Sequence, residues 1–494
     1  MVIKCLMLCA AALTGGSAAA PQTVAPATSV DWSAIARQDI NAAYDIYAAN
    51  HPGMQDPANP TFPEELKRAR DAGLEIADKT ATLGGYADAL GAFSAELADG
   101  HAQVVATEAV SPTATAKRRW PGFIAAWRGR LVIHQAGPDS PAPTGSEIIG
   151  CDGLPAASFI RKQIGFRGFR PKEPGHWWYR PTQSFYEVEG LWSGPKSCIF
   201  RLPDGGRHEA PLTYRPAPEN FAKMLAAATD GERTSIGLSE PRKGIFLIGM
   251  PDFNPDEEGV KAYRALFRAL GQRRVALRAA KAVVIDLRHN NGGSSSWSQD
   301  AARQLWGREA VDRRMDRYFR NARVWWRASA DNTAYVESLE DRLRKEGNKE
   351  GADWIRDTAK GMKAALGKGE PYYVEAEDEA PGTSSARIPV TQFKTPVYVI
   401  VSGRCASACL DALDVFTRFR NVKLIGAPSS GDSTYMDVRV QDLPSGHGKI
   451  IVPNKMWVGR PRASGEVYGP HILVTDLDWS TGAFLDRIER DLGR

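Results

Sequence analysis

Three short apolar runs constrain the fold of this chain more than any other feature. They cover residues 282–287, 397–401 and 422–426, and few polar residues interrupt them. Strands with apolar residues at successive positions are buried on both faces, which is typical of parallel sheets covered by helices. A helical pattern over 257–280 precedes the first run. Residues 240–490 are therefore predicted to form an α/β domain.

The two segments before this domain have different patterns. Apolar residues recur at helical spacing from Asp31 to about Val110, so residues 21–116 are predicted to hold a linker and an N-terminal helical bundle. Residues 117–217 alternate strand-like runs with turn residues, which indicates a β-rich domain. A stretch rich in glycine, proline and aromatic residues, about 165–194, interrupts that domain as an insertion.

The first twenty residues have the pattern of a signal peptide. Lys4 provides a basic start, Cys5–Leu13 is an apolar run, and Ser17–Ala20 supplies small residues for cleavage. The run is too short to cross a bilayer, which takes about 20 apolar residues in a helix. We expect residues 1–20 to be removed, and the mature chain to be exported to the periplasm or secreted without a membrane span.

Composition excludes some functional classes. The chain has 494 residues, of which 43% are hydrophobic and 24% charged, so it is long and apolar enough to fold into several domains. Lys and Arg number 63 and Asp and Glu 58, a formal net charge of +5. This near balance does not favour nucleic acid as a partner.

Four cysteines remain after the predicted cleavage. Cys151 and Cys198 lie in the β-rich segment, where a disulfide and two buried free thiols are both open. Cys405 and Cys409 are expected on one face of a helix. With no further Cys or His at ligand spacing, no metal site is expected, nor is any cofactor.

Two junctions between a strand and the following loop could carry chemistry. Gly292 and Gly293 follow the first apolar run, and adjacent glycines can present backbone N–H groups to an oxyanion or simply make a turn. Ser407 follows the second run where a helix is expected to begin, so it is either an activated nucleophile or an ordinary N-cap serine. His101 follows Asp99 at the end of the helical region and is a candidate base.

These motifs, in this order, resemble those of the C-terminal processing peptidase and tricorn-core superfamily of serine peptidases. The matching segments are 99–101 ("DGH"), 284–293 ("IDLRxNxGG"), 405–409 ("SASAS"), 426–431 ("GExTxG") and 443–446 ("LPxG"). Residues 145–153 resemble the "GDxIxxIDG" turn of a PDZ domain. The resemblance implies a crotonase-like α/β catalytic domain, an N-terminal helical bundle and a PDZ-like domain.

One departure from the family pattern selects between its branches. Asp432 stands where the processing branch has a lysine base, and a carboxylate cannot replace a neutral amine. The tricorn-like branch instead uses a histidine and a glutamate, which correspond here to His101 and Glu466. That branch also has a serine before the histidine, where this chain has Gly100.

The resemblance therefore implies a serine-type peptidase with a Ser–His–Glu mechanism. Ser407 would be the nucleophile, His101 the general base and Glu466 the residue that orients the histidine. The oxyanion would be bound by N–H groups of Gly292 or Gly293 and of Ala408. The expected substrate is a peptide or an unfolded protein. The alternatives are a catalytically inactive relative that binds peptides or other ligands, and an esterase or amidase that uses the same residues.

A charged, tryptophan-containing stretch, residues 297–396, is predicted to be a helical insertion in the α/β domain. It begins directly after the glycine loop and ends just before the nucleophile strand. We expect it to cover the active site; the alternative is a packing element that does not contact substrate.

Overall fold

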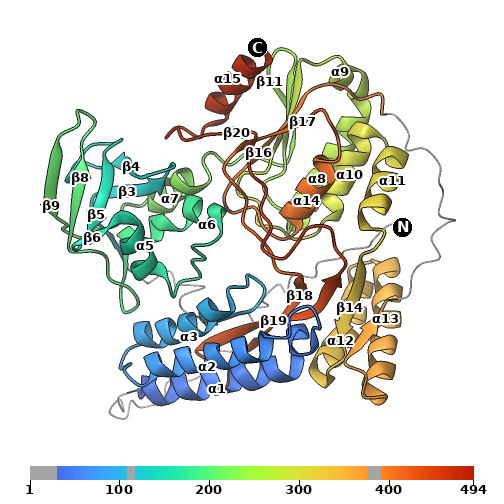
Figure 1. Cartoon of the computed structure of the whole chain (residues 1–494). Coiled ribbons are helices and arrows are strands. Elements are labelled where there is room, and N and C mark those ends of the chain that lie inside the picture. Colours follow the sequence, from blue (N-terminus) through green and yellow to red (C-terminus); the bar gives the residue numbers. More distant parts are fainter. Residues whose placement is uncertain (1–29, 108–116, 376–390, 494) are drawn as a thin grey trace, which may run out of the picture.

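The computed structural model describes residues 30–107, 117–375 and 391–493. Within these ranges the chain forms a helical region, a β-rich region and an α/β region, which follow one another in the sequence and occupy separate parts of the molecule (Figure 1). The predicted signal peptide lies outside the described residues.

Three helices form the N-terminal region: α1 (Trp32–Asn50), α2 (Phe62–Ala77) and α3 (Leu83–Leu97). A short 3-10 helix, η1 (Pro52–Gln55), joins the first two. Asp31 and Thr82 accept hydrogen bonds from backbone N–H groups in the first turns of α1 and α3, as N-cap residues do. The apolar faces of the three helices form one buried cluster with strands from the C-terminal half. After α3 the chain turns through Asp99 and His101 into strand β1 (Gln103–Ala106).

The β-rich region is built on an antiparallel sheet with the strand order β3-β4-β5-β8-β9, in which β6 also pairs with β5. Its strands are β3 (Phe123–Trp127), β4 (Leu131–Ala136), β5 (Glu147–Cys151), β6 (Leu154–Pro155), β8 (Ser197–Arg201) and β9 (Arg207–Pro211). Helix α5 (Ala156–Ile164) packs against it, and a smaller sheet joins β2 (Arg118–Trp120), β7 (Glu187–Val188) and β10 (Arg215–Pro216). The insertion contains α6 (Pro174–Tyr179) and η2 (Pro181–Phe185), and α7 (Phe221–Thr229) follows the domain. Cys151 and Cys198, paired across β5 and β8, form a disulfide, which settles the choice that the sequence left open.

The α/β region has a six-stranded sheet with the order β11-β12-β13-β16-β17-β20. The strands are β11 (Gly237–Arg242), β12 (Ile245–Gly249), β13 (Ala282–Asp286), β16 (Val397–Val401), β17 (Val422–Gly426) and β20 (Ile472–Leu473). All pairs are parallel except β11 with β12. Every residue of β12, β13 and β16 is buried, as expected for strands covered on both faces.

Helices cover this sheet on both sides. They are α8 (Glu257–Gln272), α9 (Arg274–Arg278), α10 (Ser296–Trp306), α11 (Arg308–Phe319), α14 (Ala408–Phe416) and α15 (Thr481–Leu492). The single helix expected over 257–280 is wrong, because the chain leaves helical geometry at Arg273 (φ −93°, ψ 11°), directly after Gly271-Gln272.

The prediction that residues 297–396 form a helical insertion is only partly right, because the chain between β13 and β16 also contains strands. It contributes α10 to α13, with α12 (Ala330–Lys345) and α13 (Lys349–Gly367), but also β14 (Arg323–Arg327) and β15 (Tyr372–Val374). These strands extend a second sheet through the long strand β19 (Gly448–Val458), which also pairs with β18 (Tyr435–Asp442) and with β1. The β18–β19 hairpin lies over α1–α3 in Figure 1. This second sheet therefore joins the turn at His101 to the C-terminal half of the chain.

Candidate active site

Neighbouring parallel strands bring two loops to the same edge of the sheet. β13 pairs with β16 in parallel, with Asp286 opposite Ile400, so the loops after both strands leave the sheet side by side. The first loop contains Gly292 and the second Ser407. A Cβ atom placed on Gly292 would lie 2.7 Å from the Cβ of Ser407 and 3.1 Å from the backbone nitrogen of Ala408. The two loops thus meet at the residue predicted to be the nucleophile.

Ser407 occupies a strained backbone conformation directly before α14. Its φ of 57° and ψ of −130° lie outside the regions that residues with a side chain normally adopt. Such conformations cost about 1–3 kcal/mol and cluster at functional sites. Its side chain makes no N-cap hydrogen bond, so the ordinary N-cap interpretation is wrong. A sharp turn between a strand and a helix that exposes a serine is the arrangement found at nucleophiles of hydrolases.

The glycine loop is held by a buried asparagine. Asn290 is fully buried; its Oδ1 accepts from the N–H of Gly292 at 2.9 Å and its Nδ2 donates to the carbonyl of Met250 at 2.9 Å. The N–H of Gly292 is therefore engaged, which argues against its predicted role as an oxyanion donor. Within the described ranges, the N–H groups of Gly293 and Ala408 donate no hydrogen bond to the protein.

A disulfide that sequence reasoning missed encloses Ser407. Cys405 and Cys409 are bonded, with their Cα atoms 5.3 Å apart. They do not lie on one face of a helix as expected, because α14 begins at Ala408 and Cys405 precedes it. The signal was present in the sequence, since cysteines replace both outer serines of the family's nucleophile motif in a chain expected to be exported.

Asp432 contacts the nucleophile loop from another part of the chain. Its Oδ2 accepts from the backbone N–H of Ser407 at 2.6 Å, and the Nη1 of Arg462 lies 3.8 Å from the same oxygen. The next residue, Ser433, donates from its Oγ to Oδ2 of Asp99 at 2.7 Å. This dipeptide therefore connects Ser407 to the turn that carries His101.

Among the described residues, one buried ring nitrogen of His101 has no hydrogen-bond partner. Its backbone N–H donates to Oδ1 of Asp99 at 2.8 Å, which fixes the turn, while its Nδ1 lies 3.9 Å from the same oxygen. The side chain is 14% exposed, and Nδ1 has no hydrogen-bond partner among the described residues. An unsatisfied buried nitrogen needs an explanation, and a catalytic role is one.

The backbone next to Glu466 contacts Asp432, but the Glu466 carboxylate binds a different backbone group. The residue before it, Gly465, donates its N–H to the carbonyl of Asp432 at 2.6 Å. Glu466 itself is exposed, and its Oε2 accepts from the N–H of Ala463 at 2.8 Å. The contacts of the described residues thus connect Ser407 with the His101 turn through Asp432 and Ser433, and do not include a bond between Glu466 and His101.

The insertion in the β-rich region reaches the site, which the sequence did not indicate. A Cβ atom on Gly100 would lie 2.7 Å from Nη1 of Arg170, so the guanidinium occupies the space that a serine side chain would need. Arg170 is held by Glu173, with Nε 2.6 Å from Oε1, and Oε2 of Glu173 accepts from the N–H of Gly431 at 2.9 Å. This contact gives a physical reason for the glycine before His101.

The charges around Glu173 oppose one another. Burial raises the pKa of Glu173, and the nearby carboxylates of Asp432 and Asp99 raise it further, whereas Arg170 lowers it. Burial and the same arginine lower the pKa of His176, which lies next to both residues, to about 2. His176 is therefore neutral at ordinary pH and accepts a hydrogen bond from Arg170.

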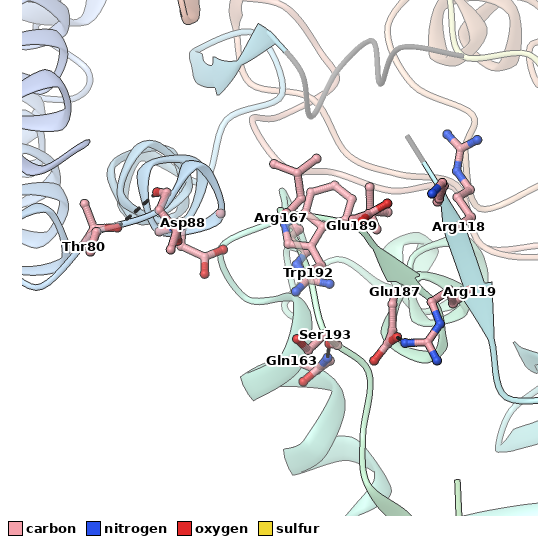
Figure 2. A pocket seen from close by; sticks show the side chains of 18 of the residues that line it. Thr80, Asp88, Arg118, Arg119, Gln163, Arg167, Glu187, Glu189, Trp192 and Ser193 are labelled. Carbon is pink, nitrogen blue, oxygen red and sulfur yellow. Dashed lines mark hydrogen bonds and ion pairs between the residues drawn. The ribbon is translucent and has the colours of Figure 1, made fainter. Parts of the chain in front are cut away.

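A cavity of about 1420 Å³ lies apart from this chemistry, between α3 and the β-rich region. Figure 2 shows Arg167 and Trp192 on one side of it, facing Asp88 of α3. The Arg167 guanidinium lies 4.5 Å from the centre of the Trp192 ring. Its lining residues include none of those at the Ser407 site, so the candidate active site is identified by its geometry and not by cavity size. Within the described ranges, no group of three or more His, Cys, Asp or Glu side chains is placed to hold a metal ion.

Comparison with known proteins agrees with the sequence motifs. Residues 244–459 match the model of Peptidase family S41. Among solved structures, mature CPAF complexed with lactacystin is similar with a TM-score of 0.60 and 14% identity, covering 93% of this chain and 98% of that one. A crystal structure of mature CPAF has the same TM-score and identity and covers 93% and 97%. Among curated proteins, no sequence matches this chain.

The solved structures show that nearly the whole chain shares its fold with CPAF. The family match covers β12 to β19, which includes Gly292, Ser407 and Asp432. Residues 244–459 therefore match Peptidase family S41, and the resemblance to this type of serine peptidase found in the sequence is confirmed.

Proposed function

We propose that the chain is an exported serine-type peptidase that cleaves peptides or unfolded proteins through an acyl-enzyme. Ser407 is the nucleophile, His101 the general base and Glu466 the residue that orients the histidine. The family match supports a serine peptidase. The observation that carries the assignment of Ser407 is its strained conformation before α14, with Gly292 directly behind it.

The proposed reaction has two halves. The Oγ of Ser407 attacks the scissile carbonyl while His101 accepts its proton and passes it to the leaving amine. Water then attacks the resulting ester while His101 accepts a proton from it and returns this proton to the Oγ of Ser407. The N–H groups of Gly293 and Ala408 stabilise the oxyanion, since the N–H of Gly292 already donates to Asn290.

Glu466 must change its contact to take its proposed role. The N–H of Ala463 now donates to its carboxylate, and Nδ1 of His101 is buried without a partner among the described residues. Catalytic hydrogen bonds are often incomplete before substrate binds. We propose that the Glu466 side chain rotates to His101 in the substrate complex and fixes the ring tautomer.

Asp432 supports the choice of a histidine mechanism over a lysine mechanism. Its carboxylate accepts the backbone N–H of Ser407, so it holds the nucleophile in place and offers no basic amine. The neighbouring Ser433 binds Asp99, two residues before His101. Both contacts favour the tricorn-like arrangement.

The two disulfides support export. Disulfides persist in oxidising compartments such as the periplasm or the extracellular space. In the described ranges, no helix is both long and apolar enough to cross a membrane.

The PDZ-like interpretation of residues 117–217 remains part of the proposal. PDZ domains bind a peptide along an exposed strand edge. Here β3 is such an edge strand, but Phe185 of η2 packs 5.6 Å from Phe123 of β3 and 5.6 Å from Phe159 of α5. Phe185 therefore fills the space between β3 and α5. This disfavours the alternative in which the protein only binds ligands between this strand and this helix.

Turnover of an unfolded protein and of a simple phenyl ester tests this function. Both are measured with the wild type, with Ser407→Ala and with Ser338→Ala, a control serine that donates to its own helix. We expect peptide cleavage in the wild type and the control and none in Ser407→Ala. Ester turnover alone would identify an esterase, and no turnover of either substrate would favour a binding protein. Full activity in Ser407→Ala would contradict the proposal.

A further inference from the structure

We propose that the Cys405–Cys409 disulfide positions the nucleophile, so that the rate of attack by Ser407 depends on this bond. The inference rests on the proposed function, because it takes Ser407 to be the reacting serine. It assigns Cys405 and Cys409 as positioning residues that act through Ser407 and do not touch substrate.

The disulfide spans the proposed nucleophile. It closes a ring of backbone over residues 405–409, with Ser407 at its centre. Both cysteines are fully buried in the core under the sheet, so each end of the ring is fixed to packed structure. A covalent bond between these two fixed points limits the backbone angles available to the residues between them.

The strained conformation of Ser407 requires restraints. A serine at φ 57° and ψ −130° relaxes to a common region unless its surroundings prevent this. Hydrogen bonds act on either side of it: the N–H of Ser430 donates to the carbonyl of Cys405 at 3.0 Å, and the N–H of Cys409 to the carbonyl of Ala406 at 3.1 Å. The disulfide adds a restraint that spans the strained residue itself.

The neighbouring glycine loop shows why a small movement matters. The space between Gly292 and Ser407 is too small for one further carbon atom, so the position of the Ser407 Cβ is defined closely against that loop. If the backbone of Ser407 relaxed, its Oγ would move away from both the base and the oxyanion donors. A misplacement of this kind lowers the rate of the chemical step while substrate binding is retained.

The test compares single and double alanine variants at the two positions. All are made in the Cys151→Ala/Cys198→Ala background, so that one disulfide remains. Each variant is assayed for kcat and KM, for the rate at which a fluorophosphonate labels Ser407, and for thermal unfolding. A positioning role for the bond predicts the same loss in all three variants: Cys405→Ala, Cys409→Ala and the double variant. In each, kcat and the labelling rate should fall by about tenfold to 100-fold, with KM nearly unchanged. Losses that multiply in the double variant would show that the side-chain volumes matter and not the bond, and would overturn the inference.

Chemical reduction tests the same claim in a protein that has already folded. A dithiol reductant converts the Cys405–Cys409 bond into two thiols and is itself oxidised to a cyclic disulfide, so two electrons and two protons are transferred. We expect the labelling rate of Ser407 to fall on reduction and to recover after air reoxidation. Thiol counting by mass spectrometry measures how much of the disulfide is reduced. In the double alanine variant the reductant should have no effect.

Two outcomes separate this inference from the proposed function. Unchanged labelling of Ser407 in the reduced or doubly substituted protein would overturn the positioning role and leave Ser407 as the nucleophile. No labelling of Ser407 in the oxidised wild type would instead reject the proposed function and the inference with it. The Cys151→Ala/Cys198→Ala protein is the matched control, and we expect it to lose stability but not kcat.

Discussion

The two loops that meet at the candidate active site are built in opposite ways. The loop after β13 reaches its shape with Gly292 and Gly293, which adopt φ values of 110° and 129° without a side-chain penalty, and with one buried amide. The loop after β16 must carry a side chain on Ser407 in a conformation that favours glycine. It is held by a disulfide and by Asp432. The glycine loop, which is proposed only to present backbone N–H groups, is held by restraints within the loop. The loop with the strained Ser407, the proposed nucleophile, is also held by a contact from a distant part of the chain.

The dipeptide Asp432–Ser433 also contacts the turn that carries the proposed base, His101. Asp432 and Ser433 bind Ser407 and Asp99 respectively, and β1 fixes the residues after His101 by pairing with β19. The proposed nucleophile Ser407 and the proposed base His101 come from parts of the chain about 300 residues apart, yet one dipeptide contacts both Ser407 and Asp99, two residues before His101. Substitutions in either loop, in their distant restraints and in the helical region should therefore differ in their effects.

Removing either of the proposed reacting groups, Ser407 or His101, should have the largest effect on activity. We expect Ser407→Ala and His101→Ala each to lower kcat by about 10⁴-fold or more, and the double variant to be no worse, since the two groups act as one unit. Thermal unfolding should change little in Ser407→Ala, because alanine in place of serine directly before a helix costs only about 1 kcal/mol. Separate, multiplying losses in the double variant would mean that the two residues do not act in the same step.

A methyl group on the glycine loop should disturb the nucleophile directly. In Gly292→Ala the new carbon would lie 2.7 Å from the Ser407 Cβ, so one loop must move, and we expect kcat to fall about 100-fold with a smaller change in KM. Steady-state kinetics on a peptide substrate measures this.

The control is Gly205→Ala in the β8–β9 hairpin. Gly205 also has a left-handed conformation, with φ 91°, but nothing lies within 4 Å of its added carbon. It carries the same backbone penalty without the collision. Equal kinetic losses in both variants would show that backbone strain, and not contact with Ser407, causes the effect.

The glycine loop was more predictable from sequence than the nucleophile loop, for a physical reason. The apolar strand and the paired glycines are local features, so the position of Gly292 followed from the pattern. The contacts of Arg170 with Gly100 and of Asp432 with Ser407 join segments far apart, and no local pattern contains them. The bond between Asn290 and Gly292 is local, but it depends on a rotamer that the motif does not specify.

The same distinction applies to the fold. Buried parallel strands such as β13 and β16 and the β18–β19 hairpin follow from composition and turn residues. β14 does not, because its sequence lies among charged helices and it becomes a strand by pairing with β19. Pairing partners distant in sequence decide such strands.

Weakening one distant restraint should have a moderate effect. In Asp432→Asn the side-chain oxygen can still accept the N–H of Ser407, but without its charge, so we expect kcat to fall about tenfold. Asp432→Ala removes the acceptor, so its kcat should fall further. Steady-state kinetics of the two variants measures this difference. Activity at the wild-type level in Asp432→Ala would show that this carboxylate does not hold the nucleophile.

The smallest effect concerns the helical region that supports the His101 turn. Burial lowers the pKa of His51 to about 3, and its ring packs 4.8 Å from Tyr435 at the start of β18. Below its ordinary pKa of about 6.5, the unfolded chain binds a proton that the folded protein does not, so stability is lost as the pH falls from about 6.5 towards 3. Urea unfolding between pH 7 and pH 4 measures this slope.

In His51→Gln that slope should be shallower by about one proton. Part of it should remain, because burial also lowers the pKa of His134, to about 4. An unchanged slope would show that His51 becomes protonated in the folded state.

Reaction with a fluorophosphonate, followed by peptide mapping, tests the central claim that Ser407 is an activated nucleophile. We expect one modified serine, Ser407, in the peptide that contains the Cys405–Cys409 disulfide, and strongly reduced labelling in His101→Ala. Labelling of a different serine, or equal labelling with and without His101, would contradict it.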